Sequence, residues 1–401
     1  MGACGLHYFP TVRANLKGRT LPTASVSRRQ VLKGFLLGVG GLAAAAAGLG
    51  QLHGPVLAQT RRTIPALQSI QMMDALTGWA VTDEPDANAL VRTTDGGMHW
   101  TDVTPLNSSG QRVSVGDVEA LTSLIAWVIS FEGIDPGPVF HTTDGGQTWS
   151  SPSTPPLFGP VHFIDAQNGW RLSGVGAAGS MEADIYRSTD GGATWTKVAS
   201  TTAGNESSGL PFAGDKGDVT FLNATTGWVT GTIIVPNWLY LYVTHDGGSS
   251  WRQQTLPLPP QVTFPWDSST VAPKFFGAQD GILPVFYRNR DTNAWLVAFY
   301  VTHDGGTTWT YTTPVSSTRE EFGPWSFADV VHGWVAGGDT LYVTTDGGSH
   351  WTKIPPSRPF TKVNRIDFIS PQIGWAVTPA SLLKTENGGR TWTPVVYTIL
   401  R

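Results

Sequence analysis

The chain has little cysteine and few charged residues. Cys4 is the single cysteine among 401 residues, so neither an intrachain disulfide nor a cysteine-rich metal site can form. Only 14% of the residues are charged, and 30 acidic residues outnumber 26 basic ones, which disfavours general nucleic-acid binding. A His-x-x-Glu-His motif and a Gly-rich phosphate loop after a strand are also absent. We therefore expect no metal, no cofactor and no nucleic-acid partner.

The N-terminal 58 residues differ from the rest. "SRRQVLK" (27–33) precedes the apolar run "GFLLGVGGLAAAAAGLG" (34–50) and the sequence "PVLAQ" (55–59). A paired arginine ahead of a mild apolar segment and a small-residue site resembles a twin-arginine export signal, with cleavage expected after Ala58. The alternative is an uncleaved membrane anchor, for which this run is short. We expect an exported protein, periplasmic, extracellular or on the cell surface, that touches the membrane only if the signal stays uncleaved.

Export changes the charge balance of the mature chain. Residues 1–58 hold six basic residues and no acidic ones, so residues 59–401 keep 20 basic and 30 acidic side chains. Cys4 leaves with the signal, and the mature chain has to be stable through its core alone.

Glycine and tryptophan are abundant, with 47 and 17 residues, and both recur in one short motif, here called the box. Seven copies occur, 41 to 58 residues apart. They are "TTDGGMHW" (93–100), "TTDGGQTW" (142–149), "STDGGATW" (188–195), "THDGGSSW" (244–251), "THDGGTTW" (302–309), "TTDGGSHW" (344–351) and "TENGGRTW" (385–392). Their acidic position is held by Asp95, Asp144, Asp190, Asp246, Asp304, Asp346 and Asn387.

A second signal lies upstream of each box: an apolar stretch, a turn, then Gly-Trp and a β-rich run, as in "IDFISPQIGWAV" (366–377). Two copies are degenerate, because Ala126 replaces the Gly in one and "PKFFGAQDGILPV" (273–285) lacks the Trp. No segment after residue 58 has a helical period of useful length, and alternation of β-branched and aromatic residues dominates.

We therefore predict four strands in each sequence repeat, with the box between the third and the fourth strand. Four antiparallel strands repeated at this spacing are typical of a β-propeller blade. We predict an all-β, seven-bladed β-propeller with four antiparallel strands per blade, formed by residues 59–401 as a single domain. Because the first and last periods both contain four strands, ring closure should rest on packing of the first blade against the last. A strand swap that uses "RRTIPAL" (61–67) is an alternative.

The box has the chemistry of a turn. Asp and Asn side chains accept backbone N–H bonds just downstream, and the Gly pair enters conformations with positive φ at low cost. A calcium loop needs several oxygen side chains that converge on one point, and one Asp beside two Gly does not supply them. We interpret the seven boxes as structural.

The pattern Ser/Thr-x-Asp-Gly-Gly-x-Thr-Trp resembles the Asp-box of the BNR repeat families, over residues 66–397. Among these, the chain is most similar to the photosystem II stability/assembly factor family, in its blade count, single domain, Gly-Trp strands and export signal. The resemblance implies a non-catalytic scaffold that binds proteins, with the boxes on the side away from the ligand face.

A glycoside hydrolase or a glycan-binding propeller, sialidase-like or xyloglucanase-like, is the alternative function. Sialidases need an arginine triad, a Tyr–Glu pair and an acid Asp on a six-bladed ring, and "RTIP" (62–65) only approaches their opening motif. A hydrolase also predicts paired carboxylates beside Trp266 and Trp295, about 5 to 10 Å apart.

Loops between blades 4 and 6 carry the candidate binding residues, since binding sites favour long loops and Arg and Trp favour interfaces. They could form one patch: Trp266, Tyr287, Arg288, Arg290, Trp295, Arg319 and Glu320. Ordinary solvated loops are the alternative reading. Arg365, on a first strand, is expected in the central channel.

Overall fold

A computed structural model describes residues 65–401 apart from 133–134, 152–158, 178, 236–237, 264–265, 318–321, 356, 359 and 361–362. The predicted export signal, Arg319 and Glu320 lie outside the described residues. Within them every regular element is a β-strand, and no helix suited by length and hydropathy to crossing a membrane occurs. The predicted all-β class is confirmed.

We number the sequence repeats 1 to 7 by their boxes. Repeats 1 to 3 contribute β1 (Ala66–Met72), β2 (Gly78–Asp83), β3 (Leu90–Thr93), β4 (His99–Asp102), β5 (Ser114–Ala120), β6 (Ala126–Glu132), β7 (Asp135–Thr142), β8 (Val161–Phe163), β9 (Gly169–Ala177), β10 (Ser180–Ser188) and β11 (Thr196–Thr201). Repeats 4 and 5 contribute β12 (Asp215–Phe221), β13 (Gly227–Ile233), β14 (Leu241–Thr244), β15 (Arg252–Gln253), β16 (Trp266–Thr270), β17 (Lys274–Phe275), β18 (Gly281–Asn289), β19 (Trp295–Thr302), β20 (Thr310–Tyr311) and β21 (Val315–Ser317). Repeats 6 and 7 contribute β22 (Phe322–Phe327), β23 (Gly333–Gly337), β24 (Thr340–Thr344), β25 (Thr352–Ile354), β26 (Arg365–Phe368), β27 (Gly374–Thr378), β28 (Ser381–Thr385) and β29 (Thr393–Val395), and β30 (Thr398–Leu400) follows.

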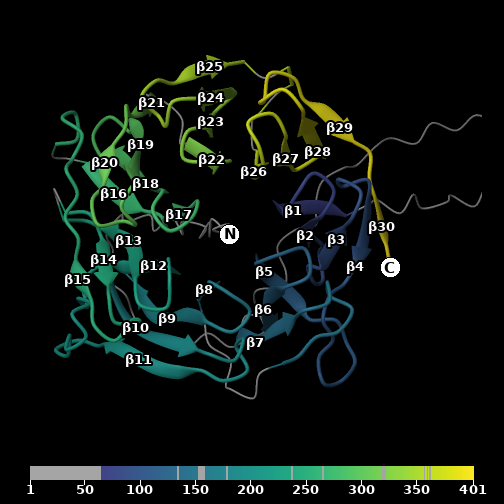
Figure 1. Ribbon diagram of the computed structural model, residues 1–401, viewed down its shortest axis with the longest axis horizontal. Helices are drawn as coiled ribbons and strands as arrows, with labels where there is room; N and C mark the ends of the chain where they lie inside the picture. Colours follow the sequence, from purple (N-terminus) through teal and green to yellow (C-terminus); the bar gives the residue numbers. More distant parts are fainter. Residues whose placement is uncertain are drawn as a thin grey trace, which may run out of the picture. The chain divides into compact units, whose positions relative to one another are not determined.

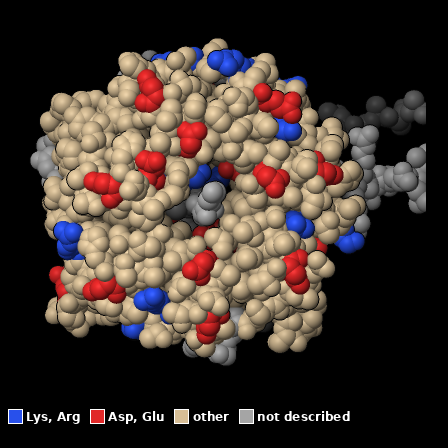
Figure 2. All heavy atoms as spheres, viewed as in Figure 1, with Lys and Arg blue, Asp and Glu red and all other residues tan. Residues whose placement is uncertain are grey.

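These strands form six sheets, in which neighbours in the chain pair antiparallel. One ten-stranded sheet joins repeats 4 and 5, because β13 pairs with β16 through Thr232–Ser269 and Ile233–Ser268. Figure 1 shows the sheets following one another around a ring, with the first strand of each toward the centre. In the same view, Figure 2 shows acidic side chains spread around a central opening.

Neighbouring sheets cover both faces of each sheet, so the second strands are buried almost throughout. The Gly-Trp run of β2 is buried from Gly78 to Thr82, and the Trp79, Trp170 and Trp375 side chains are fully buried. A strand covered on both faces reads as a continuous apolar run. This explains why the Gly-Trp segments lack alternation.

The Gly-Trp tryptophans hold each repeat to the next one. In four of the seven junctions the indole donates to the carbonyl of the first box glycine in the following repeat. These bonds are Trp127 Nε1 to Gly191 O (2.8 Å), Trp170 to Gly247 (2.9 Å), Trp334 to Gly388 (3.0 Å) and Trp375 to Gly96 (3.2 Å). The last of these bonds joins repeat 7 to repeat 1.

Two junctions use a variation of this contact. Trp79 donates to Thr122 O in the first turn of repeat 2. Trp228 donates to the Gln254 side chain, whose amide in turn donates to Gly306 O in the box of repeat 5. Repeat 5 has Ile282 at the position of the Trp.

A second set of contacts lies nearer the centre, on the first strands. One polar residue stands at the same motif position in every repeat, and we call this set the inner polar ring. It consists of Gln71, Glu119, His162, Thr220, Lys274, Ser326 and Asp367. All of these side chains are buried except Lys274, which is half-buried.

Six ring residues bond to the backbone of the next repeat, always one residue beyond its own ring position. The contacts are Gln71 to Ala120 O, Glu119 with the Phe163 backbone, His162 to Phe221 O, Lys274 to Phe327 O, Ser326 with Phe368 N, and Asp367 with Met72 N. Glu119 also pairs with His162, at 3.3 Å, and Thr220 Oγ1 lies 3.4 Å from His162 Nε2. Burial raises the pKa of Glu119, and contact with the Glu119 carboxylate raises that of His162 against the effect of burial. The ring residues are thus satisfied structurally, as buried polar groups must be.

Closure of the ring uses more than the expected face packing. Trp375 and Leu382 of repeat 7 do pack on Ile70 and Trp100 of repeat 1. In addition β30 pairs in parallel with β4 and adds a fifth strand to the first sheet. The prediction of closure by face packing alone was therefore wrong, because the last residues extend past the fourth strand of repeat 7.

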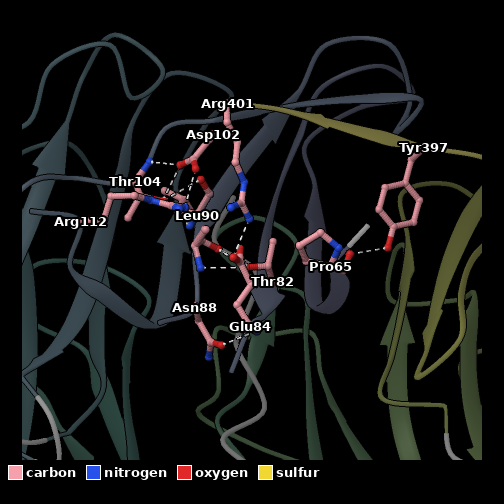
Figure 3. Close-up of polar contacts among 11 residues, drawn as sticks. Pro65, Thr82, Glu84, Asn88, Leu90, Asp102, Thr104, Arg112, Tyr397 and Arg401 are labelled. Carbon is pink, nitrogen blue, oxygen red and sulfur yellow. Dashed lines mark hydrogen bonds and ion pairs between the residues drawn. The ribbon is translucent and has the colours of Figure 1, made fainter. Parts of the chain in front are cut away.

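Side chains reinforce this closure (Figure 3). Tyr397 donates to Pro65 O at 3.0 Å, and Arg401 pairs with Glu84 at 2.6 Å. Tyr397 thus contacts the residue before β1, and Arg401 contacts the residue after β2. Residues 61–64 lie outside the described residues, and from Ala66 the chain forms β1, which pairs with β2.

Each box is a turn closed by hydrogen bonds of its own side chains. In the box of repeat 2, Thr142 Oγ1 donates to Asp144 Oδ1 and accepts from Gly146 N, while Asp144 also accepts from Thr148 N and Thr148 Oγ1. Both box glycines have positive φ, 77° and 85° at Gly145 and Gly146. Asn387 supports the same turn, with Oδ1 accepting from Thr391 N and Nδ2 donating to Thr391 Oγ1. A neutral amide therefore serves where the other boxes have a carboxylate.

We predict that Trp375→Phe destabilises the protein more than Trp392→Phe. Both side chains are buried, but only the Trp375 indole has a partner, and its loss leaves the Gly96 carbonyl without a donor. The difference in the free energy of unfolding should be about 1–3 kcal/mol. Urea denaturation measures it, and equal losses in the two variants would contradict the role given to the indole contact.

We predict that Asp144→Asn makes stability less dependent on pH in acid. Hydrogen bonds from the Thr148 side chain and backbone lower the pKa of Asp144 from 3.8 to about 2. The folded state thus binds fewer protons than the unfolded state in this range, so stability is present above pH 3.8 and is lost toward pH 2. Thermal unfolding across this window should show a shallower slope for the variant. Asp291→Asn, in an exposed turn, is the control and should keep the native slope.

Candidate binding surface

Four of the predicted binding residues lie on strands, Trp266, Tyr287, Arg288 and Trp295, and Arg290 lies in the turn after β18. Residues 284–295 belong mostly to β18 and β19, which form a hairpin with Arg288 opposite Trp295. Strand β16 pairs along the other edge of β18, with Asp267 opposite Arg288 and Trp266 opposite Asn289. The hairpin end of this sheet is the end opposite to the box, because Gly281 pairs with Thr302 at the box end.

Alternation along these strands divides the predicted residues between two faces. Asp267, Arg288 and Trp295 share one face, and Trp295 packs beside Phe286 in the core between repeats 5 and 6. Trp266 lies on the other face and packs beside Tyr287. The expected single patch with both tryptophans is therefore corrected, since opposite positions on paired strands point to the same side.

Tyr287 is a core residue. Its side chain is 1% exposed, and its hydroxyl lies 2.9 Å from that of Tyr300, which donates to Pro257 O. Burial and the Tyr300 hydroxyl raise the pKa of Tyr287 far above its usual range. We correct the expectation that this residue lies on a surface loop.

Arg290 and Arg288 form the exposed part of the hairpin end. Arg290 Nε donates to Asp267 Oδ1 at 2.7 Å, and its terminal nitrogen also reaches Ile234 O at 3.2 Å. The hydrogen bond to Asp267 raises the pKa of Arg290. Arg288 lies over the Trp295 ring at 5.7 Å and donates to Asn293 Oδ1.

Exposed aliphatic side chains adjoin these arginines. Ile234 and Val235, at the end of β13, are 61% and 43% exposed. We define the hairpin surface as Ile234, Val235, Asp267, Arg288, Arg290 and Trp295. It combines apolar area with oriented guanidinium groups, which are frequent at protein interfaces.

Asp267 is the carboxylate of this surface, and it is engaged by Arg290. Within the described residues no group of three His, Cys, Asp or Glu side chains is placed to hold a metal ion.

Arg365 begins β26, the first strand of repeat 7, and is half-buried. It lies two residues from Asp367 of the inner polar ring. Burial raises the pKa of the Asp367 carboxyl, and the positive charge of Arg365 offsets part of this increase. Arg365 thus belongs to the centre of the ring, away from the hairpin surface.

The sequence did not reveal a buried lysine, Lys216, on β12. Its ammonium donates to the carbonyls of Met181, Phe212 and Gly214, at 2.8, 3.0 and 3.1 Å. Burial lowers the pKa of Lys216 to about 8. The polar sequence "GDKGD" (214–218) resembles a solvated turn, so no local signal pointed to this contact between repeats 3 and 4.

Comparison with known proteins identifies the repeat. The BNR/Asp-box repeat model matches residues 186–197, which contain the box of repeat 3. None of the curated protein sequences is detectably similar to this chain.

Solved structures share the fold. "YCF48 bound to D1 peptide" is 20% identical, with 81% of this chain and 94% of that chain covered and a TM-score of 0.52. An uncharacterized protein from Listeria monocytogenes EGD-e is 9% identical, with 84% and 98% covered and a TM-score of 0.50. An ancestral GH74 enzyme reaches a TM-score of 0.34, at 12% identity over 82% of this chain and 62% of that one. The chain is a β-propeller with a BNR/Asp-box repeat, and its fold is similar to that of YCF48.

Proposed function

We propose that the chain is an exported, non-catalytic, seven-bladed β-propeller that binds a protein partner as an assembly scaffold. The hairpin surface carries this proposal, because it presents oriented arginines beside exposed aliphatic side chains at the end of the sheet opposite the boxes. Arg288 and the apolar pair suit a partner segment with acidic and apolar side chains.

Seven blades are supported by the repeat register. The inner polar ring has seven members, one for each box, and each repeat contributes a second strand that begins at its Gly-Trp position or the equivalent. The ten-stranded sheet corresponds to two blades joined through β13 and β16. Repeat 2 adds a bridge between His141 and Ser150 in place of a full fourth strand.

The comparison with YCF48 supports the same class of partner. That structure holds a D1 peptide, and it shares the fold at low identity. We propose that this chain likewise binds a peptide segment of its partner.

A glycoside hydrolase remains the competing function. It requires two carboxylates that act together across the substrate. On the hairpin surface Asp267 is paired with Arg290, which favours binding over acid–base chemistry.

Binding by the hairpin surface is tested by affinity capture with the exported protein. Partners retained by the native chain should be lost, by about tenfold or more, in Arg288→Ala/Arg290→Ala. Lys353→Ala removes an exposed cation from repeat 6 and is the control. A glycan screen runs in parallel. Cleavage of a bound glycan by the native chain would overturn the non-catalytic scaffold.

Export is tested separately. Arg28→Lys/Arg29→Lys should retain the protein in the cytoplasm, since the twin-arginine pair is read by the export machinery. In the native chain, N-terminal sequencing of the exported form should begin at Gln59. A form that keeps residues 1–58 and sediments with membranes would favour the anchor.

A further inference from the structure

A groove lies between the boxes of repeats 5 and 6. Its volume is about 570 Å³, and its lining includes Val301, Tyr311, Thr312, Val330, Asp346 and Gly347. It opens on the box side of the sheets, at the end of β18 and β19 opposite the hairpin surface.

The groove coincides with the one repeat that lacks its Gly-Trp tryptophan. Ile282 takes that position, and Val301 stands opposite it on β19. In repeats 1, 3 and 7 the opposite position holds Arg92, Arg187 and Lys384, each with its charge over the Trp ring at 5.2–5.7 Å. In repeat 2, His141 stacks on Trp127. Repeats 4 and 6 also have a valine opposite the tryptophan, Val243 and Val343, so the combination of Ile282 with Val301 is what sets this junction apart.

The hydrogen-bond acceptor for the missing indole is retained. Gly347 is the first box glycine of repeat 6, equivalent to Gly191, Gly247 and Gly388, whose carbonyls accept from indoles. In the described part of the chain no indole donates to the Gly347 carbonyl, and Gly347 lines the groove. The Thr312 hydroxyl beside it is buried without a partner.

The rim of the groove is acidic. Asp304 and Asp346 both line it, and hydrogen bonds within their boxes lower the pKa of each. Asp280 stands close by, paired with the lining residue His303 at 2.6 Å. A cationic segment is therefore attracted to this groove.

We propose that this groove binds a tryptophan side chain of a partner protein, in a segment that carries basic residues beside the tryptophan. The indole ring packs against Val301, Val330 and Tyr311, and its N–H donates to the Gly347 carbonyl. Flanking Lys or Arg side chains lie near Asp304 and Asp346. The partner thus supplies the contact that four other junctions make within the chain.

This inference rests on the proposed protein-binding function but uses the opposite end of the sheets. Loss of groove binding therefore leaves the result of Arg288→Ala/Arg290→Ala unchanged. The two proposals can fail independently.

The test uses the full chain and a defined probe, the peptide acetyl-Lys-Trp-Lys-amide, in calorimetric titration. Saturable binding is expected, with affinity about tenfold weaker for acetyl-Lys-Leu-Lys-amide and for acetyl-Glu-Trp-Glu-amide. Equal affinity for the Leu and Trp peptides, no saturable binding, or displacement of the peptide by a glycan would overturn the proposal.

Two variants locate the site. Ile282→Trp restores the tryptophan of the other repeats and should reduce affinity for the probe about tenfold or more, because the groove is filled from within. Val301→Arg introduces the residue found at the equivalent place in repeats 1 and 3, and should weaken binding to a similar extent. Val243→Arg makes the same change in repeat 4, above Trp228, and should leave affinity within about twofold. Unchanged binding in a folded Val301→Arg protein would contradict the assignment, even if Ile282→Trp does not fold.

Discussion

The structure depends on the junction between consecutive repeats. Each sheet has two apolar faces, and water is excluded only if both are covered by neighbours. A buried indole serves this junction in two ways. Its ring fills the space between the two sheets, and its N–H donates a hydrogen bond to a carbonyl of the next box. At Trp127, Trp170 and Trp334 the ring also stacks on a Phe of the next first strand, at centroid distances of 3.7 Å.

This arrangement explains why the box and the Gly-Trp strand recur together. The box does more than reverse the chain, because its first glycine presents a carbonyl to the preceding repeat. The inner polar ring makes a parallel set of contacts at the first strands, and in both sets repeat 7 is joined to repeat 1. β30 adds a third connection on the outside of the ring. Repeat 5 departs from the pattern at Ile282, and a groove lies between its box and the box of repeat 6.

The two ends of the sheets therefore differ in what they offer a partner. At the hairpin end, function is proposed for side chains that vary between repeats, such as Arg288 and Arg290. At the box end, it is proposed for a position where a repeated contact is missing. Both rest on departures from the repeat: at the hairpin end on side chains that vary, and at the box end on a box carbonyl that no indole of the described chain reaches.

The sequence by itself determined the all-β class, the turn chemistry of the boxes and the recurrence of one strand pattern, because these depend on residues close together in the chain. The sequence also predicted Arg288, Arg290 and Trp295 as binding residues, but placed them on loops, in one patch with Tyr287 and Trp266. Only strand pairing decided that Tyr287 points inward and that the two tryptophans lie on opposite faces, because a side chain's face follows from its register with neighbouring strands. The inner polar ring, the pairing of β30 with β4 and the groove between the boxes of repeats 5 and 6 were likewise decided by tertiary structure, since each joins residues from different repeats. No local pattern encodes which backbone group a distant side chain will meet.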